Sequence, residues 1–205
     1  MRPYVLGVTG GIGSGKSSVS RLLSSYCLVP LVDIDACCRH LLNIEQPGWY
    51  ALRSAFGSGD LFCSDGTVDR KTLRERIFND ADFRRQVNGL LHPLARDVMS
   101  KQIERLNTPL VLIEIPLLFE AGWQQDVDAV LVVYARKAVR CLRIMRRDGV
   151  SRREAAKAIA AQMDLRQKAE RADYLIDNSQ AWSRTRSDVV ALGNLLSKQF
   201  PCSFC

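Results

Sequence analysis

The sequence predicts an α/β fold in which a parallel sheet is covered by helices on both faces. Short apolar, β-branched runs recur along the chain, and helical patterns lie between them. This alternation is typical of a parallel sheet whose strands are buried on both sides. The predicted strands are residues 4–8, 28–32, 110–115, 129–133 and 174–176. At 205 residues the chain is long enough to bury the core of one such domain.

The first predicted strand leads into a glycine-rich loop. Residues 10–17 read GGIGSGKS and match the phosphate-binding pattern G-x-x-x-x-G-K-[ST] in full; we call this segment the P-loop. Its glycines allow successive backbone N–H groups to converge on phosphate oxygens, and a helix from about Gly15 directs its positive end at the same anion. Lys16 can reach the β- and γ-phosphates, and the Ser17 hydroxyl can bind Mg2+. The fold class is therefore a P-loop NTPase sheet. Its predicted nucleotide-binding residues are Gly11, Gly13, Ser14, Gly15, Lys16, Ser17 and Ser18.

A long insertion separates the second and third predicted strands. It contains helical patterns at 47–56, 70–78 and 82–106 around a polar turn at 64–67. Because it is too long for one crossover helix, we expect a helical subdomain, about 46–107, that holds the second substrate. The rest of the single domain 1–205 would be a core, about 1–45, 108–135 and 172–205, and a helical lid, about 136–171.

The positive charge of the chain is concentrated in the predicted lid. The formal net charge is +7, and between positions 136 and 153 lie eight basic residues with Asp148 as the only acid. Gly149 would end a first helix there, and a capping box of Ser151 with Glu154 would start a second one that runs to about residue 163. One face of the first helix would carry Arg136, Arg140, Arg143 and Arg147, and the opposite face Ala138, Cys141, Leu142 and Met145. This arginine stripe is either a solvated face or, as we favour beside a P-loop, a set of guanidinium groups that close over a polyphosphate.

Two carboxylates follow the second predicted strand. Residues 32–35 read VDID, and ligands of open α/β sheets bind beyond the C-terminal ends of the strands. If the strand continued, Asp33 and Asp35 would point the same way, beside the P-loop. One of them could contact the Mg2+ shell while the other accepts a proton from a substrate hydroxyl. Alternatively, Asp35 caps a helix that begins at Ala36.

The cysteine content and the hydropathy pattern indicate a compartment. Seven cysteines are an odd number, and most lie within apolar patterns, which favours reduced thiols over disulfides or zinc ligands. Cys202 and Cys205 form a C-x-x-C at the terminus without a second pair. No stretch approaches about twenty consecutive apolar residues, and the first residues run directly into a strand. We therefore expect a soluble, cytoplasmic protein without a membrane or an obligate protein partner.

Across nearly its whole length the sequence resembles the dephospho-CoA kinase family of P-loop small-molecule kinases. Ordered motifs carry the resemblance: GVTGGIGSGKS at 7–17, VDID at 32–35 with Arg39, DGT at 65–67, LRERIF at 73–78, LHP at 91–93, IPLLFE at 115–120, Arg143, RD at 147–148, AAQ at 160–162 and ADYLIDNS at 172–179. The resemblance implies transfer of the γ-phosphoryl group of ATP to the ribose 3′-hydroxyl of dephospho-CoA, giving CoA and ADP. It also implies ATP and Mg2+ as cofactors.

The same resemblance implies catalytic roles. Asp35 would be the general base toward the 3′-hydroxyl and Asp33 its support, although the opposite assignment is possible. Lys16, the loop amides and Mg2+ would neutralise the γ-phosphoryl group, while Arg143 and Arg147 approach its developing charge.

Other residues are implied as ligand contacts. Candidate contacts to the substrate are Arg39, His92 and Glu120, and Asn178 is a candidate contact to the nucleotide base. Three of these residues also have an alternative role. His92 could instead pack between helices, Glu120 could be structural, and Asn178 could end a turn.

The sequence departs from the usual family pattern at four positions. Ile34 stands where alanine is usual between the two aspartates, and Ser18 stands where threonine is usual, so the carboxylates and hydroxyls are kept. Tyr134 replaces an aspartate at the end of the strand before the lid, and Arg140 replaces a glutamine at its start. These two changes affect how the lid is positioned.

Three alternative functions remain open at this stage. GTPases, motor ATPases and small-molecule kinases all use the P-loop, so the motif alone names no reaction. A nucleoside monophosphate kinase would share the core, the insertion and the lid. A P-loop nucleotide-binding switch or a nucleic-acid-binding protein ranks lower, because an N-K-x-D motif is absent and the basic residues lack interleaved aromatics.

Overall fold

The computed structural model describes residues 2–57 and 59–201. The chain divides into two compact units: residues up to Asp33 together with those from Leu106 onward, and residues Ile34–Arg105. The second unit overlaps the insertion that was predicted at about 46–107 and begins earlier in the chain. The predicted residues Cys202 and Cys205 lie outside the described residues.

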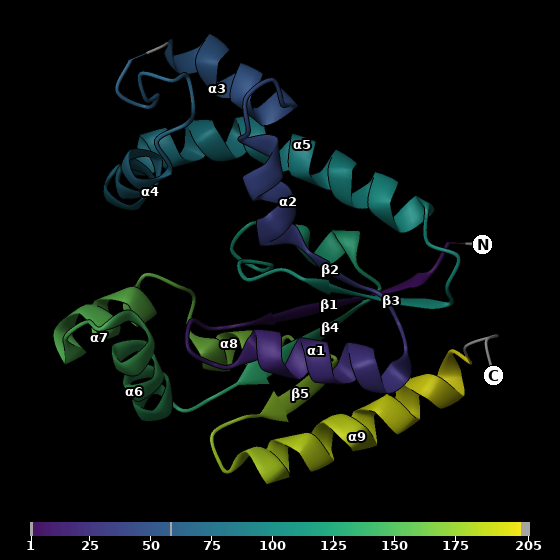
Figure 1. Cartoon of the computed structure of the whole chain (residues 1–205). Helices are drawn as coiled ribbons and strands as arrows, with labels where there is room; N and C mark the ends of the chain where they lie inside the picture. Colours follow the sequence, from purple (N-terminus) through teal and green to yellow (C-terminus); the bar gives the residue numbers. More distant parts are fainter. Residues whose placement is uncertain (1, 58, 202–205) are drawn as a thin grey trace. The chain divides into compact units, whose positions relative to one another are not determined.

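The first unit is built on a five-stranded parallel sheet, so the predicted fold class is confirmed. The strands are β1 (Tyr4–Gly10), β2 (Leu31–Asp33), β3 (Leu110–Glu114), β4 (Ala129–Tyr134) and β5 (Tyr174–Asp177), in the spatial order β2-β3-β1-β4-β5 (Figure 1). β2 starts later than predicted because Leu28 adopts a left-handed conformation, with φ 54°, that caps the preceding helix.

One face of the sheet is covered by α1 (Lys16–Cys27) and α9 (Trp182–Gln199), which pack against each other (Figure 1). Alternate residues of the strands point to this face, and they form a core with the apolar stripes of the two helices. Leu6, Leu131 and Leu23 are completely buried in it. Burial of each such side chain contributes roughly 1.5–3 kcal/mol.

The opposite face is covered by the chain between β3 and β4 and by α8 (Leu165–Glu170), which contacts β4. The connection includes the 3-10 helix η1 (Trp123–Asp126). Gly7 of β1 faces this side, and Leu118 and Val127 fill the space that a side chain at this position would need. A glycine here lets the connection lie directly against the strand.

A helical hairpin follows β4. It consists of α6 (Lys137–Asp148) and α7 (Arg152–Ala160), with Gly149 in a left-handed conformation at the end of α6 and the predicted capping box at Ser151 and Glu154. The predicted apolar face of α6 was wrong at Leu142, which is 55% exposed, whereas Ile144 is buried. Ile144 packs with α7 and with Ile12 of the P-loop.

α7 also ends earlier than predicted. Its last residue is Ala160, and Asp164 then caps α8 by accepting a hydrogen bond from the backbone N–H of Arg166 at 2.7 Å. Asp164, as the N-cap residue of a new helix, lies four residues after the end of α7 and favours a break between the two helices.

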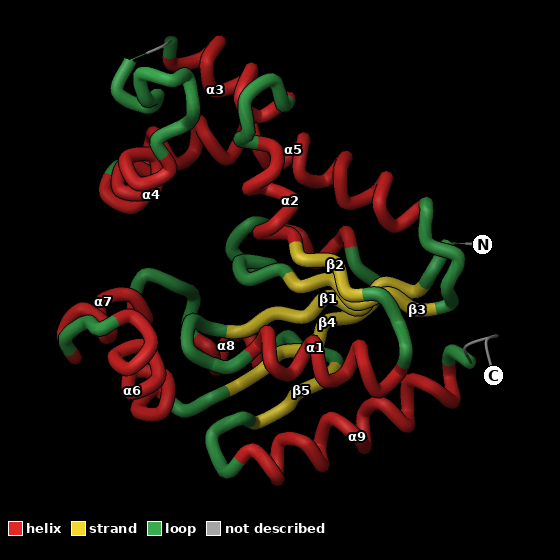
Figure 2. Tube along the Cα trace, viewed as in Figure 1, coloured by secondary structure: helices red, strands yellow, loops and turns green. Residues whose placement is uncertain are grey.

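The second unit consists of α2 (Ile34–Leu41), α3 (Pro47–Phe56), α4 (Arg70–Asn79) and α5 (Ala81–Glu104) (Figure 2). Asp69 and Asp80 cap α4 and α5 with their side chains. The core of this unit is a separate cluster around Trp49, Leu52 and Phe83. The Trp49 indole donates a hydrogen bond to the carbonyl of Gly66, which lies in the predicted polar turn.

Within residues 2–57 and 59–201, no helix is long and apolar enough to cross a membrane. The cysteines described there are not joined in disulfides; they are Cys27, Cys37, Cys38, Cys63 and Cys141.

We predict that Gly48→Ala destabilises the protein and that Gly89→Ala does not. A Cβ at Gly48 would lie 2.8 Å from the carbonyl oxygen of Leu41, a backbone atom that cannot rotate away, whereas nothing lies within 4 Å of a Cβ at Gly89. We expect Gly48→Ala to lower the free energy of unfolding by about 1–3 kcal/mol. Gly89→Ala, on the exposed side of α5, should raise it by up to about 1 kcal/mol. Urea denaturation checks both, and equal effects would contradict this account of α3.

Candidate functional site

The P-loop connects β1 to α1 and depends on two glycines with positive φ. Gly13 has φ 76° and Gly15 has φ 85°, a region that side-chain-bearing residues rarely adopt. Both also lie against neighbouring groups: a Cβ at Gly13 would be 2.8 Å from the Arg140 carbonyl, and one at Gly15 would collide with the Asn178 amide. α1 begins directly after the loop, and no side chain caps it at Gly15. Its first amides therefore suit an anion.

Side chains from α6 hold the carbonyl side of the loop. Arg140 Nε donates to the carbonyl oxygen of Ile12 at 2.9 Å. Arg143 Nη1 donates to the carbonyl oxygens of Gly13 at 3.4 Å and Ser14 at 3.2 Å. Because the carbonyl and the next N–H of a trans peptide point in opposite directions, these bonds turn the following amides away from the arginines.

The residue after β5 completes this support. Asn178 Nδ2 donates to the Ser14 carbonyl oxygen at 2.8 Å, and its side-chain oxygen accepts from Thr185 Oγ1 at 2.9 Å. The carbonyl of Asn178 accepts from Arg143 Nη2 at 2.9 Å. Asn178 is buried, and its amide group contacts the loop backbone and Thr185.

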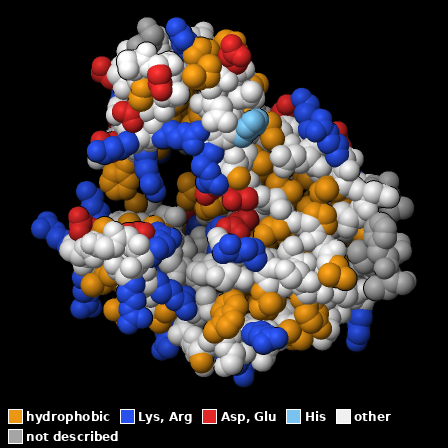
Figure 3. Space-filling view, in the orientation of Figure 1, with side chains coloured by type: hydrophobic (Ala, Val, Ile, Leu, Met, Phe, Trp, Pro, Cys, Tyr) orange, Lys and Arg blue, Asp and Glu red, His pale blue; other side chains and the backbone are white. Residues whose placement is uncertain are grey.

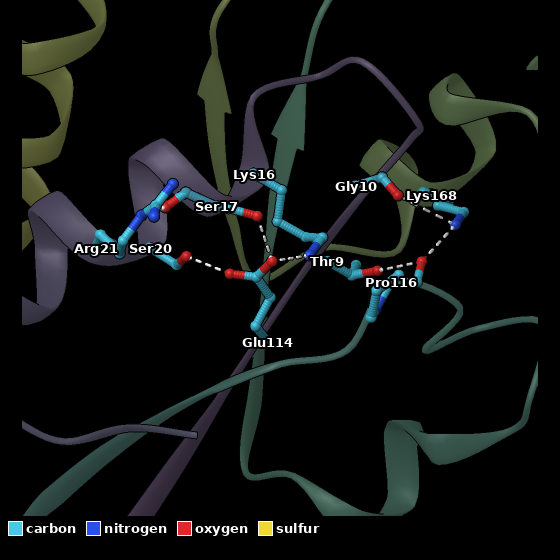
Figure 4. Close-up of polar contacts among 9 residues, drawn as sticks. All are labelled: Thr9, Gly10, Lys16, Ser17, Ser20, Arg21, Glu114, Pro116 and Lys168. Carbon is cyan, nitrogen blue, oxygen red and sulfur yellow. Dashed lines mark hydrogen bonds and ion pairs between the residues drawn. The ribbon is translucent and has the colours of Figure 1, made fainter. Parts of the chain in front are cut away.

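A buried carboxylate, Glu114, lies at the other side of the P-loop, at the end of β3 (Figure 4). It accepts hydrogen bonds from Ser17 Oγ at 2.6 Å and Ser20 Oγ at 2.5 Å, and it forms an ion pair with Lys16. Burial alone would raise the pKa of the Glu114 carboxyl, but the three hydrogen bonds together outweigh it and lower the pKa from its ordinary value. Sequence reasoning missed this residue. The available signal was an acid that ends an otherwise apolar strand beside the P-loop.

Lys168 of α8 is a second buried group that the sequence did not suggest. Its side chain is 0% exposed, and Nζ lies 2.7 Å from Glu120. Figure 4 shows its two backbone contacts, to the Pro116 carbonyl at 3.3 Å and to the Gly10 carbonyl at 3.5 Å. Burial lowers the pKa of Lys168, and Glu120 opposes that shift. A lysine within a polar helical pattern gives no signal that it is buried.

The arginine stripe does not form one uniform surface. Arg140 is only 4% exposed, and burial lowers the pKa of its guanidinium. Arg147 is exposed and forms a two-bond pair with the neighbouring Asp148, at 2.7 and 2.8 Å. On the side of the molecule that Figure 3 shows, many of the Lys and Arg side chains lie over α6 and α7. The stripe therefore combines residues that hold the loop backbone with residues that face solvent.

Asp33 and Asp35 lie on different elements. Asp33 is the exposed last residue of β2 and is the register partner of Glu114 on β3. The strand ends there because α2 begins at Ile34, so the extended backbone that would align the two aspartates is not present. Asp35 lies in the first turn of α2, and the predicted cap of a helix starting at Ala36 was therefore wrong.

The remaining predicted residues of the second unit lie on helices. Arg39 is in the last turn of α2, and its carbonyl accepts a hydrogen bond from Arg70 at 3.0 Å. His92 is half-buried on α5, directly before Pro93. Burial, and then the nearby Arg96, lower the pKa of His92.

Comparison with known proteins identifies the family. The family model described as Dephospho-CoA kinase matches residues 4–183. A dephospho-CoA kinase of Oceanobacillus iheyensis is 38% identical over 197 residues, which are 95% of this chain and 96% of that protein. The chain belongs to the dephospho-CoA kinase family. The resemblance seen in the sequence is thus confirmed, and the protein is an ATP-dependent phosphotransferase of a family that acts on a hydroxyl group.

Solved structures share the fold of this chain. A crystal structure of a Thermus thermophilus protein is 32% identical, with a TM-score of 0.81, and the match covers 97% of this chain and 98% of that one. A dephospho-CoA kinase from Campylobacter jejuni is 24% identical, with a TM-score of 0.63 over 97% of this chain and 100% of that one, and it supports the fold.

The donor set at the P-loop fits Mg2+ and phosphate. Ser17 and Glu114 offer hard oxygen ligands of the kind Mg2+ prefers, and the buried Ser14 hydroxyl has no hydrogen-bond partner among the described residues. No cluster of three or more His, Cys, Asp or Glu side chains suited to a metal occurs in the described part of the chain.

We predict that Glu114→Gln destabilises the protein in a pH-dependent way. The variant keeps the shape and removes the charge that Lys16, Ser17 and Ser20 surround, so the free energy of unfolding should fall by about 1–3 kcal/mol at pH 7. The folded-state pKa of Glu114 lies below its ordinary value of 4.5. The contribution of the carboxylate is therefore present above that value and is lost as the pH falls through the folded-state pKa.

The difference in stability between wild type and Glu114→Gln should accordingly shrink on acidification. Urea denaturation between pH 7 and about pH 3 measures it, because the loss begins near the ordinary pKa and is complete only below the lowered one. Glu170→Gln, at an exposed position of α8, is the control and should change little at either pH. A difference that grows on acidification would contradict the assigned role of Glu114.

Proposed function

We propose that this chain transfers the γ-phosphoryl group of ATP to the ribose 3′-hydroxyl of dephospho-CoA, giving CoA and ADP. The observation that carries this function is the P-loop with Lys16 and Ser17 converging on Glu114, in a chain that matches the dephospho-CoA kinase family over residues 4–183. The described cysteines of both units are not joined in disulfides, which fits a reducing compartment such as the cytoplasm.

In this function the P-loop binds the phosphates of ATP. The Gly13 and Gly15 amides, turned away from the arginines, and the N-terminus of α1 would donate hydrogen bonds to phosphate oxygens. Lys16 would exchange its contact with Glu114 for the β- and γ-phosphates. Ser17 and Glu114 would hold Mg2+, directly or through its water shell. When bound, Mg2+ supplies positive charge that offsets the charge developing on the transferred group.

We assign Asp35 as the general base toward the 3′-hydroxyl and Asp33 as its support. Asp33 is beside Glu114 in the sheet. Asp35 follows it by two residues, so the chain keeps the two Cα atoms within about 7 Å of each other. A carboxylate in that position is suited to accept the proton of an attacking hydroxyl.

Arg143 and Arg147 are the proposed cationic groups of the lid. Arg143 already lies on the P-loop backbone, where its guanidinium is close to the loop that would hold the phosphates. Arg147 lies one helical turn farther along α6 and would leave Asp148 to contact the γ-phosphoryl group. Arg39 and His92 are the proposed contacts of the second unit to dephospho-CoA, and Asn178 is the proposed neighbour of the nucleotide base.

The direct test is release of ADP in a coupled assay with ATP and dephospho-CoA. We expect turnover with dephospho-CoA and little with AMP, CMP or dTMP as the acceptor. Preference for a nucleoside monophosphate would reject the proposed substrate and favour the alternative kinase.

Lys16→Ala should lower turnover by at least about a thousandfold while the circular dichroism spectrum stays native, because the lysine supplies charge and the backbone forms the loop.

Asp35→Asn and Asp33→Asn separate the two carboxylates. Asparagine keeps the shape and removes the basicity, so Asp35→Asn should lower kcat by about 100-fold or more with a modest change in KM for dephospho-CoA. Asp33→Asn should have the smaller effect on kcat. If the two variants show the reverse order, the assignment of the base must be exchanged.

A further inference from the structure

Lys168 is the most deeply buried charged side chain of the first unit, and its position calls for a reason. Lysine is almost never fully buried unless its ammonium is paired. Here the ammonium has three N–H donors and three acceptors: the carboxylate of Glu120 and the carbonyls of Pro116 and Gly10. The hydrogen-bonding capacity of the group is therefore filled by the protein itself.

The three acceptors come from two segments that flank the P-loop. Gly10 is the last residue of β1, where the P-loop begins, and Pro116 and Glu120 follow β3. The same connection is tied to β1 a second time, because Thr9 Oγ1 donates to the Pro116 carbonyl at 3.2 Å. Lys168, on α8, thus joins the start of the P-loop to the chain that leaves the neighbouring strand (Figure 4).

The segment that leads from α7 into α8 contacts the same region. Met163 N donates to Glu120 Oε1 at 3.1 Å, and Gln162 Oε1 accepts from the amide of Ile12 in the P-loop at 2.7 Å. Glu120 is therefore held by two groups at the end of the lid segment, Lys168 and Met163. These contacts favour a structural role for Glu120 over the substrate contact that the sequence left open.

Stability alone is a weak reason for such a pair. Removing the Lys168 ammonium from water is costly, whereas Glu120 stays in contact with solvent, and a well-packed apolar side chain in place of a buried charge is often equally stable. A packed methyl group, however, donates no hydrogen bond to a carbonyl. What the lysine adds is the orientation of the Gly10 peptide group. Because that peptide is trans, a bond to the Gly10 carbonyl turns the Gly11 amide to the opposite side. Arg140 has the same effect farther along the loop, where its bond to the Ile12 carbonyl orients the Gly13 amide.

We propose that Lys168 is a positioning residue for phosphoryl transfer, which fixes the first peptide group of the P-loop and anchors the end of the lid segment to it through Glu120. The residue touches neither ATP nor the acceptor in this role. It acts through the Gly10–Gly11 peptide, whose amide belongs to the phosphate-binding loop. This role rests on the proposed kinase function.

The test compares Lys168→Met, Glu120→Gln and the double variant with wild type. Each single variant removes one member of the ion pair and leaves the other without its counter-charge, which should lower the unfolding free energy. The double variant removes both charges and should regain most of that stability. If Lys168 positions the loop, kcat should stay about 10- to 100-fold below wild type in Lys168→Met and in the double variant, because neither restores the bond to the Gly10 carbonyl. KM for ATP should change much less than kcat.

Lys198→Met, at an exposed position of α9, is the matched control and should retain the kcat of wild type. If the double variant regains both stability and kcat, Lys168 serves only as the counter-charge of Glu120, and the proposal is overturned. Wild-type kcat in Lys168→Met would overturn it as well.

A second measurement does not depend on the acceptor. Hydrogen exchange of the peptide that contains residues 10–16 should be slowed by ATP in wild type and much less in the double variant. Equal slowing in both proteins would overturn the positioning role. If wild type turns over no dephospho-CoA, the proposed substrate is wrong, and the exchange experiment still decides the role of Lys168.

Discussion

The orientation of the P-loop peptide groups is the constraint on which the rest of the nucleotide site depends. The loop can present amides to a phosphate only if its carbonyls point elsewhere and find partners there. Arg140, Arg143 and Asn178 supply those partners, and each comes from a segment far along the chain from the loop. Two glycines with positive φ make the required backbone path possible, and the neighbours of Gly15 leave no room for a side chain there.

This arrangement gives the basic residues of the lid segment two different tasks. Arg140 and Arg143 bond to carbonyl oxygens of the loop, whereas Arg147 is exposed beside Asp148. Some of the positive charges of the chain therefore hydrogen-bond to the loop backbone, and they do not form a uniform surface for nucleic acid. Carboxylates, one buried and one solvent-exposed, lie beside the cations that remain. Glu114 forms an ion pair with Lys16, and Glu120 forms one with Lys168. The two ammonium groups beside the loop therefore have counter-charges before any nucleotide binds.

The elements of the fold were predictable because their signals are local. Apolar β-branched runs predicted five strands, and the start signals at Ser151 and the stop signal at Gly149 predicted the helical hairpin after β4. The errors also have local causes. Leu28 closes α1 in a left-handed conformation and delays β2, and α2 begins immediately at Ile34, so that Asp35 lies inside a helix and no longer on a continuing strand. Leu142 of α6 is exposed although its position in the pattern predicted a buried face.

The sequence by itself determined the P-loop, the order of strands and helices, and the family, because glycine spacing, capping residues and hydrophobic period act over a few neighbouring residues. The tertiary structure alone decided which charged groups meet behind that loop. Glu114 reaches Lys16 across 98 positions of sequence, Arg140 reaches Ile12 across 128, and Lys168 reaches Gly10 across 158. No periodicity links residues so far apart. Parallel strands bring their carboxyl ends to one edge of the sheet, and only that meeting turns an acid at the end of β3 and a lysine on α8 into parts of one site.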